Sequence, residues 1–263
     1  MKKNLAKTAA LLSALLLTLC LSACSMGLNE MLIVKRAYRQ VADMDSLSFT
    51  VDADLDAQLA SVPIRAGLDG DCSCIIDPGT LYMDMSIDMG KLGKLELPIY
   101  LFAQDDALQL RIGLGGEEEA LWFSSSLPLS NGKSQDKAVD VETVLTLLQD
   151  DPEALSIGDS ETVNGVLCRP FILKIPGALL TDALSTADPE GGSSVEDLVL
   201  TIWIAEEEGS PVRLSADLAS LLQYLLDNSH APLVSQLKIK TLPTTVDITG
   251  FNDVESIKLP QAG

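Results

Sequence analysis

Residues 49–59 read Phe49-Thr50-Val51-Asp52-Ala53-Asp54-Leu55-Asp56-Ala57-Gln58-Leu59. Apolar side chains stand at every second position, and mostly acidic side chains fill the positions between them. Successive side chains of a β-strand point to opposite faces of the sheet. This alternation therefore predicts a strand with one buried face and one solvated face.

The same alternation recurs in the segments that follow. Apolar or small residues occupy the even positions of 66–76 and the odd positions of 81–89, with Asp and Ser prominent between them. Further strands are predicted at Leu95–Ala103, Leu108–Leu114 and Leu121–Leu127. Because the connections are short turns such as Asp77-Pro78-Gly79, we predict an antiparallel meander of about six strands.

Helices and further strands are predicted on both sides of this meander. Residues 29–43 carry apolar side chains at helical spacing (Met31, Val34, Tyr38 and Val41), with Asn29 as a helix cap. The elements predicted after the meander are a helix over Val139–Asp150, a hairpin turn at Asn164-Gly165 leading into a strand over Val166–Ile175, a helix over Gly177–Ser185, strands over Leu198–Ala205, Val212–Asp217 and Leu237–Ile248, and a helical insert over Leu218–Leu226.

A long sheet with one apolar face must curl or be covered. We therefore predict an α+β fold that is mainly β. A strongly curved antiparallel sheet, an incomplete β-barrel, would wrap around a few helices. The inward side chains would then either fill the interior or line a cavity.

The N-terminal segment has the features of a lipoprotein export signal. A basic start with Lys2 and Lys3 precedes an apolar run, residues 9–19, which is too short for a comfortable membrane span. The run leads to Leu21-Ser22-Ala23-Cys24, the lipobox pattern of small residues before a Cys. We predict that a signal peptidase recognises Leu21, Ser22 and Ala23, and that Cys24 becomes the lipid-modified N-terminus. The alternative is an ordinary secretory signal or a signal anchor, with an incidental Cys.

The predicted organisation is a signal peptide over residues 1–23, a lipidated tether over 24–28 and a single domain over 29–263. A diacylated Cys would anchor the chain stably on the extracytoplasmic face of the cell membrane. Four residues of tether span roughly 14 Å at most, so the domain would work close to the membrane surface.

The charge of the chain narrows the classes of partner. The sequence has 18 Lys and Arg against 38 Asp and Glu. Removal of residues 1–23 takes away Lys2, Lys3 and Lys7 and no acid, so the net charge of the remainder is near −23. Such a surface repels nucleic acid and anionic lipid headgroups, which argues against nucleic-acid binding. Most of these charges are expected to form a solubilising surface, and we predict a monomer.

Three Cys remain in the predicted domain: Cys72, Cys74 and Cys168. In an exported protein, a disulfide between Cys168 and either Cys72 or Cys74 is plausible, and it would leave one odd thiol. The alternative, a redox or metal site, has a thin ligand set with no nearby His. We therefore predict neither a metal nor a cofactor.

Catalytic patterns are not prominent in the sequence. The single His, His230, sits in a polar turn, and nothing near it in sequence supports a Ser-His-Asp or Cys-His site. The Gly-rich turn at 113–116 is followed by Glu117, Glu118 and Glu119, which have the wrong sign for holding phosphate. We therefore predict that the protein is not an enzyme.

The order of the elements resembles the LppX/LprG lipoproteins and, more distantly, the LolA/LolB-like half-barrel fold. The phrases that carry the resemblance are Asp45-Ser46-Leu47-Ser48-Phe49, Asn164-Gly165-Val166-Leu167-Cys168, Leu200-Thr201-Ile202-Trp203-Ile204-Ala205 with Gly209-Ser210-Pro211-Val212-Arg213, and Val246-Asp247-Ile248-Thr249-Gly250-Phe251-Asn252 with Ile257-Lys258-Leu259-Pro260. The resemblance covers most of residues 28–260. It implies a half-barrel around an acyl-chain cavity, in non-enzymatic proteins that bind or carry lipids and lipoproteins.

The inward apolar face is the candidate ligand site. The residues predicted to line it are Phe49, Val51, Leu55, Leu68, Met83, Met85, Ile87, Met89, Leu108, Leu110 and Phe123. The Met side chains offer adaptable contacts for irregular ligands. From spacing alone, however, such a stripe is more often plain core. The function predicted is lipid or hydrophobe binding, as a carrier or chaperone; the alternative is a ligand-free protein-interaction or envelope-sensor module of the same fold.

Overall fold

The computed structural model describes residues 32–33, 35–37, 39–40, 43–76, 79–104, 107–115, 121–128, 154–184, 194–227 and 237–259. Its strands are β1 (Ser46–Leu59), β2 (Val62–Ile75), β3 (Thr80–Asp88), β4 (Lys94–Gln104), β5 (Ala107–Leu114), β6 (Leu121–Pro128), β7 (Leu155–Ile157), β8 (Glu161–Val163), β9 (Val166–Ile175), β10 (Leu198–Ala205), β11 (Pro211–Asp217), β12 (Leu237–Thr241) and β13 (Pro243–Phe251). The helices with described bounds are α4 (Gly177–Leu184), α5 (Ala219–Asp227) and the short 3₁₀ helix η1 (Gly90–Leu92). Helical residues are also described at 32–33, 35–37 and 39–40.

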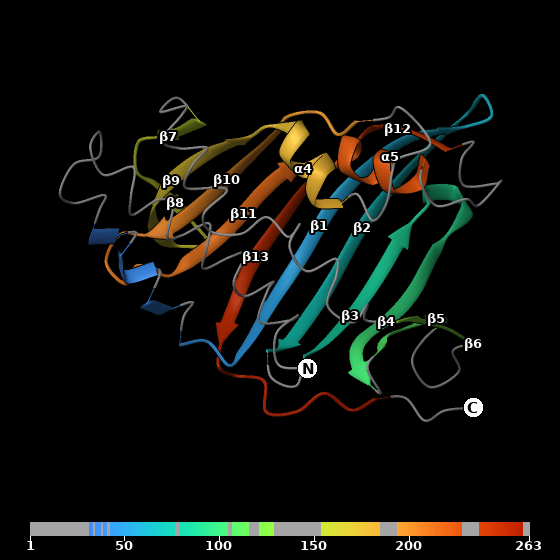
Figure 1. Ribbon diagram of the computed structural model, residues 1–263, viewed down its shortest axis with the longest axis horizontal. Helices are drawn as coiled ribbons and strands as arrows, with labels where there is room; N and C mark the ends of the chain where they lie inside the picture. Colours follow the sequence, from blue (N-terminus) through green and yellow to red (C-terminus); the bar gives the residue numbers. More distant parts are fainter. Residues whose placement is uncertain are drawn as a thin grey trace.

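All these strands belong to one antiparallel sheet (Figure 1). Its order is β6-β5-β4-β3-β2-β1-β13-β11-β10-β9-β7, with β12 paired to β1 and β8 paired to β9. The six-strand meander predicted from the alternation forms one half of the sheet. The late strand β13 then pairs with β1 and joins the meander to the second half, which is built from β7 to β11.

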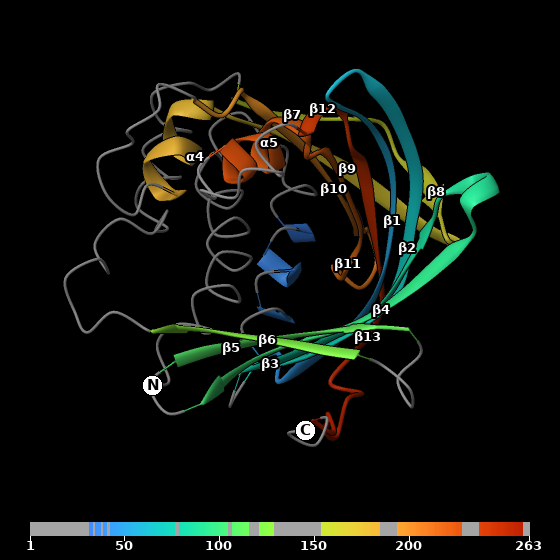
Figure 2. The ribbon, with the colours of Figure 1, turned by 90° about the vertical axis from the view of Figure 1, so that its right-hand side faces the viewer.

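The sheet is strongly curved, and the helices lie on its concave side. Figure 2 shows β5 and β6 crossing the bottom of the view, while β1, β2, β9 and β10 rise along one side. α4 and α5 lie within the angle between these two groups. Among the described strands, the two ends of the sheet, β6 and β7, do not meet. The predicted fold class, a mainly β half-barrel around a few helices, is confirmed.

The main buried core lies in the second half of the sheet. Phe171 and Leu173 of β9 and Ile202 and Ile204 of β10 are at most 2% exposed. Ile33 and Ala37 pack into the same cluster, and both lie in the described helical residues between 32 and 40. The predicted N-terminal helix is therefore present, whereas its predicted apolar stripe lies outside the described residues, as does the helix predicted over 139–150.

A smaller core fixes α5 to the concave face. Ala219 and Leu222 of this helix belong to one cluster with three apolar residues of the meander, Ala53, Leu55 and Leu68. One Oδ of Asp217 accepts hydrogen bonds from the backbone N–H of Ala219, at 2.9 Å, and of Leu242, also at 2.9 Å. The first bond caps the helix, since the early N–H groups of a helix have no partner within it.

The strand predicted over 237–248 is wrong as a single element. The structure has two strands, β12 and β13, which pair with successive parts of β1. Leu242 lies between them with its side chain in the smaller core, and the Asp217 bond satisfies its backbone N–H. Pro243 follows and lacks a backbone N–H, so it cannot donate to a continuous ladder. The predicted hairpin turn is confirmed, with positive φ at Asn164 (50°) and Gly165 (81°) between β8 and β9.

The predicted disulfide does not form in this structure. Cys72, Cys74 and Cys168 are all free thiols. Cys72 and Cys74 lie on β2, and Cys168 lies on β9, five strand positions away in the sheet. At about 4.8 Å per strand the path is roughly 24 Å, whereas bridged Cα atoms lie within about 7 Å of each other. Strand order, which spacing along the chain does not fix, separates these Cys residues.

Candidate functional site

The concave face of the meander is apolar but incompletely buried. Its central side chains, Met83 and Met85 of β3 and Leu97 and Ile99 of β4, are half-buried. The residues that form the two buried clusters come from the second half of the sheet, the helices and the strands next to α5. Within the described residues, β3 to β6 contribute no member to either cluster. In the second half several inward side chains are at most 2% exposed, whereas those named on β3 and β4 are only half-buried.

The strand register places nine of the eleven predicted ligand residues on this face. Ala53, which contacts α5, pairs with Leu68, and Leu68 pairs with Ile87, which fixes the inward side of β1, β2 and β3. The same alternation carries through β4 to β5 and β6. The nine residues are Phe49, Val51, Leu55, Leu68, Met83, Met85, Ile87, Leu110 and Phe123. The side chain of Leu108 lies outside the described ones.

Two of the predicted residues behave differently from the others. Met89 lies beyond the end of β3, where it precedes η1, and its side chain is 36% exposed. The structure therefore does not place Met89 with the rest. Phe123 is on the inward side of β6 but is 58% exposed. A large aromatic side chain with this exposure adds to the uncovered apolar surface.

Gly70 makes room for Met85 on the same face. The two residues are register partners on β2 and β3. A Cβ built on Gly70 would overlap the Sδ atom of Met85. The absence of a side chain at Gly70 therefore lets the Met85 thioether lie flat across β2. Sequence reasoning did not find this contact, although a Gly inside a strand is a recognised signal of close approach.

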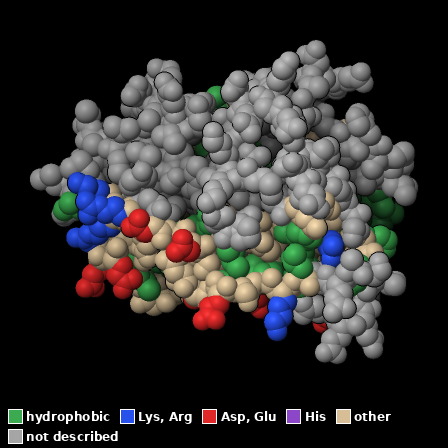
Figure 3. Space-filling model, turned by 60° about the horizontal axis from the view of Figure 1, so that its bottom comes forward, with side chains coloured by type: hydrophobic (Ala, Val, Ile, Leu, Met, Phe, Trp, Pro, Cys, Tyr) green, Lys and Arg blue, Asp and Glu red, His purple; other side chains and the backbone are tan. Residues whose placement is uncertain are grey.

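The convex side of the meander differs from the solvated face that the alternation predicted. Tyr82, Tyr100 and Trp122 form a row of rings, with centroids 4.6 Å and 5.7 Å apart. Arg111 lies 5.2 Å from the ring centre of Phe102, at cation–π distance. Tyr100 and Phe102 are only 2% and 3% exposed. This part of the sheet is therefore apolar on both faces, while acidic side chains are visible elsewhere on the underside of the molecule (Figure 3).

Three segments that carry the sequence resemblance meet in one ion-pair network. Arg213 of β11 donates hydrogen bonds from Nε and Nη2 to the Asp247 carboxylate of β13, at 2.7 and 2.8 Å. The Asn164 amide, in the β8–β9 turn, donates to the same carboxylate at 2.9 Å and accepts from Arg213 at 3.2 Å. The hydrogen bonds from Arg213 lower the pKa of Asp247 below its usual value; burial opposes this shift and the Asn164 bond adds to it.

Replacing Asp247 with Asn is expected to lower the free energy of unfolding by about 1–3 kcal/mol at neutral pH, because the side chain loses a two-bond contact with Arg213. A carboxylate with a lowered folded pKa stabilises the fold above its unfolded pKa of about 3.9, and this stability is lost as pH falls through the folded value. The difference between the two proteins should therefore shrink below pH 4. Urea unfolding at several pH values measures it, with the exposed Asp159→Asn as control. A difference that stayed constant down to pH 2 would contradict the assignment.

The thiols do not have the character of a reactive or metal-binding site. Burial, with smaller contributions from Asp71 and Asp84, raises the pKa of Cys72 to about 12. Burial also raises the pKa of Cys74 and of Cys168. A thiol is a nucleophile and metal ligand only as the thiolate, which these surroundings disfavour. Among the described residues no group of three or more His, Cys, Asp or Glu side chains is arranged to hold a metal ion.

The fold and the concave face define a half-barrel protein with a half-buried apolar face, and its fold was compared with those of known structures. No protein-family model matches the chain, and no curated protein matches it. The fold is similar to that of the lipoprotein LppX of Mycobacterium tuberculosis, at 12% identity and a TM-score of 0.47 over 86% of this chain and 97% of that one. It is also similar to LprF of Mycobacterium bovis, at 11% identity and a TM-score of 0.42 over 88% and 96%.

A third similar structure is a DUF1329 family protein of Desulfovibrio piger, at 12% identity and a TM-score of 0.27 over 85% of this chain and 92% of that one. A structure of the LppX type, which the sequence motifs resemble, is among those to which the fold is similar. At these identities the similarity concerns the fold alone. No helix in the described ranges is long and apolar enough to cross a membrane.

Proposed function

We propose that this protein is a membrane-anchored extracytoplasmic lipoprotein that binds a lipid or another hydrophobic ligand on the concave face of its half-barrel, as a carrier or chaperone. The observation that carries the proposal is the apolar concave face of β3 to β6, whose side chains stay half-buried while the other half of the same face holds a dense core. A contiguous apolar surface that is not fully buried is typical of a ligand-binding or interaction site.

The residue types on this face suit an acyl chain. Met83 and Met85 lie side by side with Leu97 and Ile99 across β3 and β4. Unbranched Met side chains adapt to irregular apolar partners, and the aliphatic neighbours add no polar group. Each methylene of a ligand buried here contributes about 0.8 kcal/mol.

Lipidation of Cys24 would hold this face close to the bilayer from which such a ligand comes. The lipobox at residues 21–24 and the short tether support this placement. The acyl-chain cavity implied by the resemblance remains a prediction.

A protein-interaction module without a ligand is the second candidate. Val166 and Leu167, at the start of β9, are 39% and 53% exposed. Together with the turn at Glu206–Glu208 they line a hollow of about 310 Å³. An exposed apolar patch beside an acidic turn could meet a partner protein.

Native mass spectrometry of residues 25–263, purified from a bacterial host without detergent, tests the first proposal. We expect an additional bound mass in the phospholipid or glycolipid range, which organic extraction removes. A mass equal to that of the protein alone, unchanged after incubation with lipid vesicles, would contradict ligand binding and favour the interaction module.

Replacing both Met83 and Ile99 with Asn is expected to abolish the bound mass. These two residues are register partners at the centre of the half-buried face. When a hydrophobic ligand binds, the two Asn amides would lose their hydrogen bonds to water and would gain none from the ligand. The matched control is Val199→Asn, which changes a 51% exposed apolar side chain on β10 and should leave ligand occupancy unchanged. Circular dichroism would establish that both variants are folded. Retention of the ligand by the folded double variant would place the binding site elsewhere.

A further inference from the structure

The N-terminal helix, described at residues 32–33, 35–37 and 39–40, carries two cations on its outer side. Ile33 and Ala37 are 5% and 0% exposed and pack into the main core. Successive side chains of a helix are turned by about 100°, so Lys35 and Arg39 point away from that core. Both are exposed, and Leu32, which is 47% exposed, lies on the same side of the helix. We call Leu32, Lys35 and Arg39 the basic helix face.

The charge of this face is the reverse of the charge of the chain. The whole sequence has 38 Asp and Glu against 18 Lys and Arg, yet no acidic residue occurs from Met31 to Ala42. None of the ion pairs between described residues involves Lys35 or Arg39. Figure 3 shows Lys and Arg side chains gathered at the end of the molecule at which Figure 1 places the N-terminal helical residues.

The N-terminal helix is fixed to the sheet by its flank. Arg36 donates hydrogen bonds from Nη1 to the backbone carbonyls of Glu207, at 2.6 Å, and Glu206, at 3.3 Å, in the β10–β11 turn. Gly209 ends this turn with a φ of 78°, and a Cβ built on it would overlap the Cβ of Arg36. The exposed acids Glu207 and Glu208 belong to the turn, which contacts the Arg36 flank rather than the basic helix face. The direction of that face is therefore set relative to the whole half-barrel.

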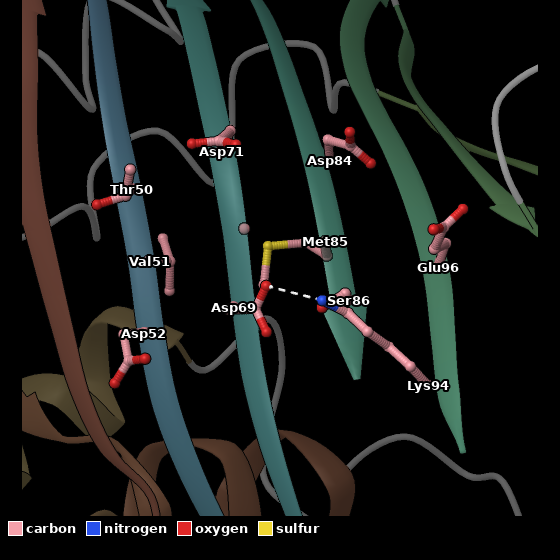
Figure 4. Close-up of a pocket in the computed structure, with 11 residues that line it drawn as sticks. Thr50, Val51, Asp52, Asp69, Asp71, Asp84, Met85, Ser86, Lys94 and Glu96 are labelled. Carbon is pink, nitrogen blue, oxygen red and sulfur yellow. Dashed lines mark hydrogen bonds and ion pairs between the residues drawn. The ribbon is translucent and has the colours of Figure 1, made fainter. Parts of the chain in front are cut away.

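The convex side of the meander carries the opposite charge. Four acids, shown in Figure 4, stand on β1, β2 and β3: Asp52, Asp69, Asp71 and Asp84. Asp52 is the register partner of Asp69, and Asp71 is that of Asp84. Lys94 lies among them with its ammonium 3.5 Å from Oδ2 of Asp69, as the dashed line in Figure 4 marks. An anionic bilayer repels a surface of this kind and attracts the basic helix face.

We propose that the basic helix face lies on the anionic phospholipid headgroups of the membrane that holds Cys24. The inference rests on the Cys24 anchor of the proposed function. Eight residues separate Cys24 from Leu32, so the face can be at most about 28 Å from the anchor. Cations beside a membrane anchor are attracted to anionic headgroups, and an apolar neighbour such as Leu32 enters the interface. Because the helix is packed into the core, this contact orients the whole half-barrel on the bilayer.

A chain that starts at Cys24, joined through this thiol to a maleimide-bearing lipid, tests the proposal without enzymatic lipidation. All described residues lie beyond residue 31, and circular dichroism establishes that the coupled chain is folded. Burial raises the pKa of Cys72, Cys74 and Cys168, so these thiols react slowly with maleimide. The coupled chain is placed on vesicles of phosphatidylcholine alone and on vesicles that also contain phosphatidylglycerol. Acetylation by acetic anhydride, an uncharged reagent, is then followed at each Lys by mass spectrometry.

Lys35 should be acetylated about threefold more slowly on the anionic vesicles than on the neutral ones, because the headgroups hold its ammonium. Lys238 is the matched control. Its side chain is 63% exposed on β12, which Figure 1 places at the other end of the molecule, and its rate should be nearly the same on both vesicles. Salt at about 1 M reduces the screening length to about 3 Å and should remove the difference at Lys35.

Two single substitutions separate the basic helix face from the total charge. Arg39→Gln should return the acetylation rate of Lys35 on anionic vesicles most of the way to its value on neutral ones, because one of the two cations is lost. Gln also keeps the helix propensity of this position. Lys240→Gln makes the same change of charge on β12, where the Lys240 side chain is 55% exposed, and should leave the slow rate at Lys35 unchanged.

Three results would overturn the proposal. One is an equal rate at Lys35 on the two kinds of vesicle. Another is the same slowing at Lys35 and at Lys238, which would indicate a general effect of the anionic surface. The third is an equal rate at Lys35 in the Arg39 and Lys240 variants. Each of these leaves the lipidation of Cys24 intact, since labelling with palmitate measures that modification separately.

Discussion

Replacing Cys24 with Ala is expected to abolish lipid labelling of the protein completely. The Cys24 thiol is the only atom in the predicted lipobox that can accept the diacylglyceryl group, so no other side chain there can substitute for it. Growth of the expressing bacterium with labelled palmitate, followed by immunoprecipitation, measures the effect. The wild-type chain should carry the label, and the variant should carry none.

Cys20→Ala is the matched control for this experiment. Cys20 lies in the same segment but follows the bulky Leu19 rather than a small residue, so its replacement should leave labelling intact. A chain expressed without residues 1–23 should leave the membrane fraction, because each buried acyl methylene contributes about 0.8 kcal/mol to anchoring and none would be present. If the Cys24 variant kept the label and the Cys20 variant lost it, the lipidated residue would be Cys20 rather than Cys24.

Phe171→Ala should lower the free energy of unfolding by about 3–5 kcal/mol, a large share of the total stability of an ordinary domain. Phe171 is 0% exposed on β9, where it is the register partner of Ile202 on β10 and Ile157 on β7. It belongs to the cluster into which Ile33 and Ala37 pack. Its truncation would open a cavity between the sheet and the N-terminal helix.

Urea unfolding followed by circular dichroism measures this effect as a shift of the transition midpoint. The matched control is Leu167→Ala on the same strand, because Leu167 is 53% exposed and its truncation should cost below about 1 kcal/mol. Phe171→Leu should fall between them, since it keeps most of the buried apolar volume. Equal midpoints for the two alanine variants would show that the second half of the sheet does not hold the stabilising core.

The local pattern of the sequence was sufficient for the strands of the meander. Alternation at residues 49–59, 66–76 and 81–89 fixed both the existence of β1, β2 and β3 and the face to which each side chain points. The Asn164-Gly165 pair similarly fixed a tight turn, because both residues tolerate the positive φ that such a turn requires. These features depend on neighbours within a few residues.

Long-range features were beyond the sequence pattern. The predicted Cys pairing was wrong because β13, β11 and β10 lie between β1 and β9, the strand that carries Cys168. The break at Leu242 was missed because it depends on Asp217, a side chain 25 residues away. The aromatic row on the convex face was likewise hidden, since Tyr82, Tyr100 and Trp122 are individually ordinary strand residues.

By itself the sequence determined the mainly β class, the inward face of each meander strand and the hairpin turn, since each follows from chemistry within a short window. Only the tertiary structure decided which of the described inward side chains are fully buried. It brought Arg213, Asp247 and Asn164 together, and it set two pairs of acids opposite each other around Ser86. The physical reason is that alternation assigns a side chain to a face, whereas strand order and curvature assign its neighbours on that face.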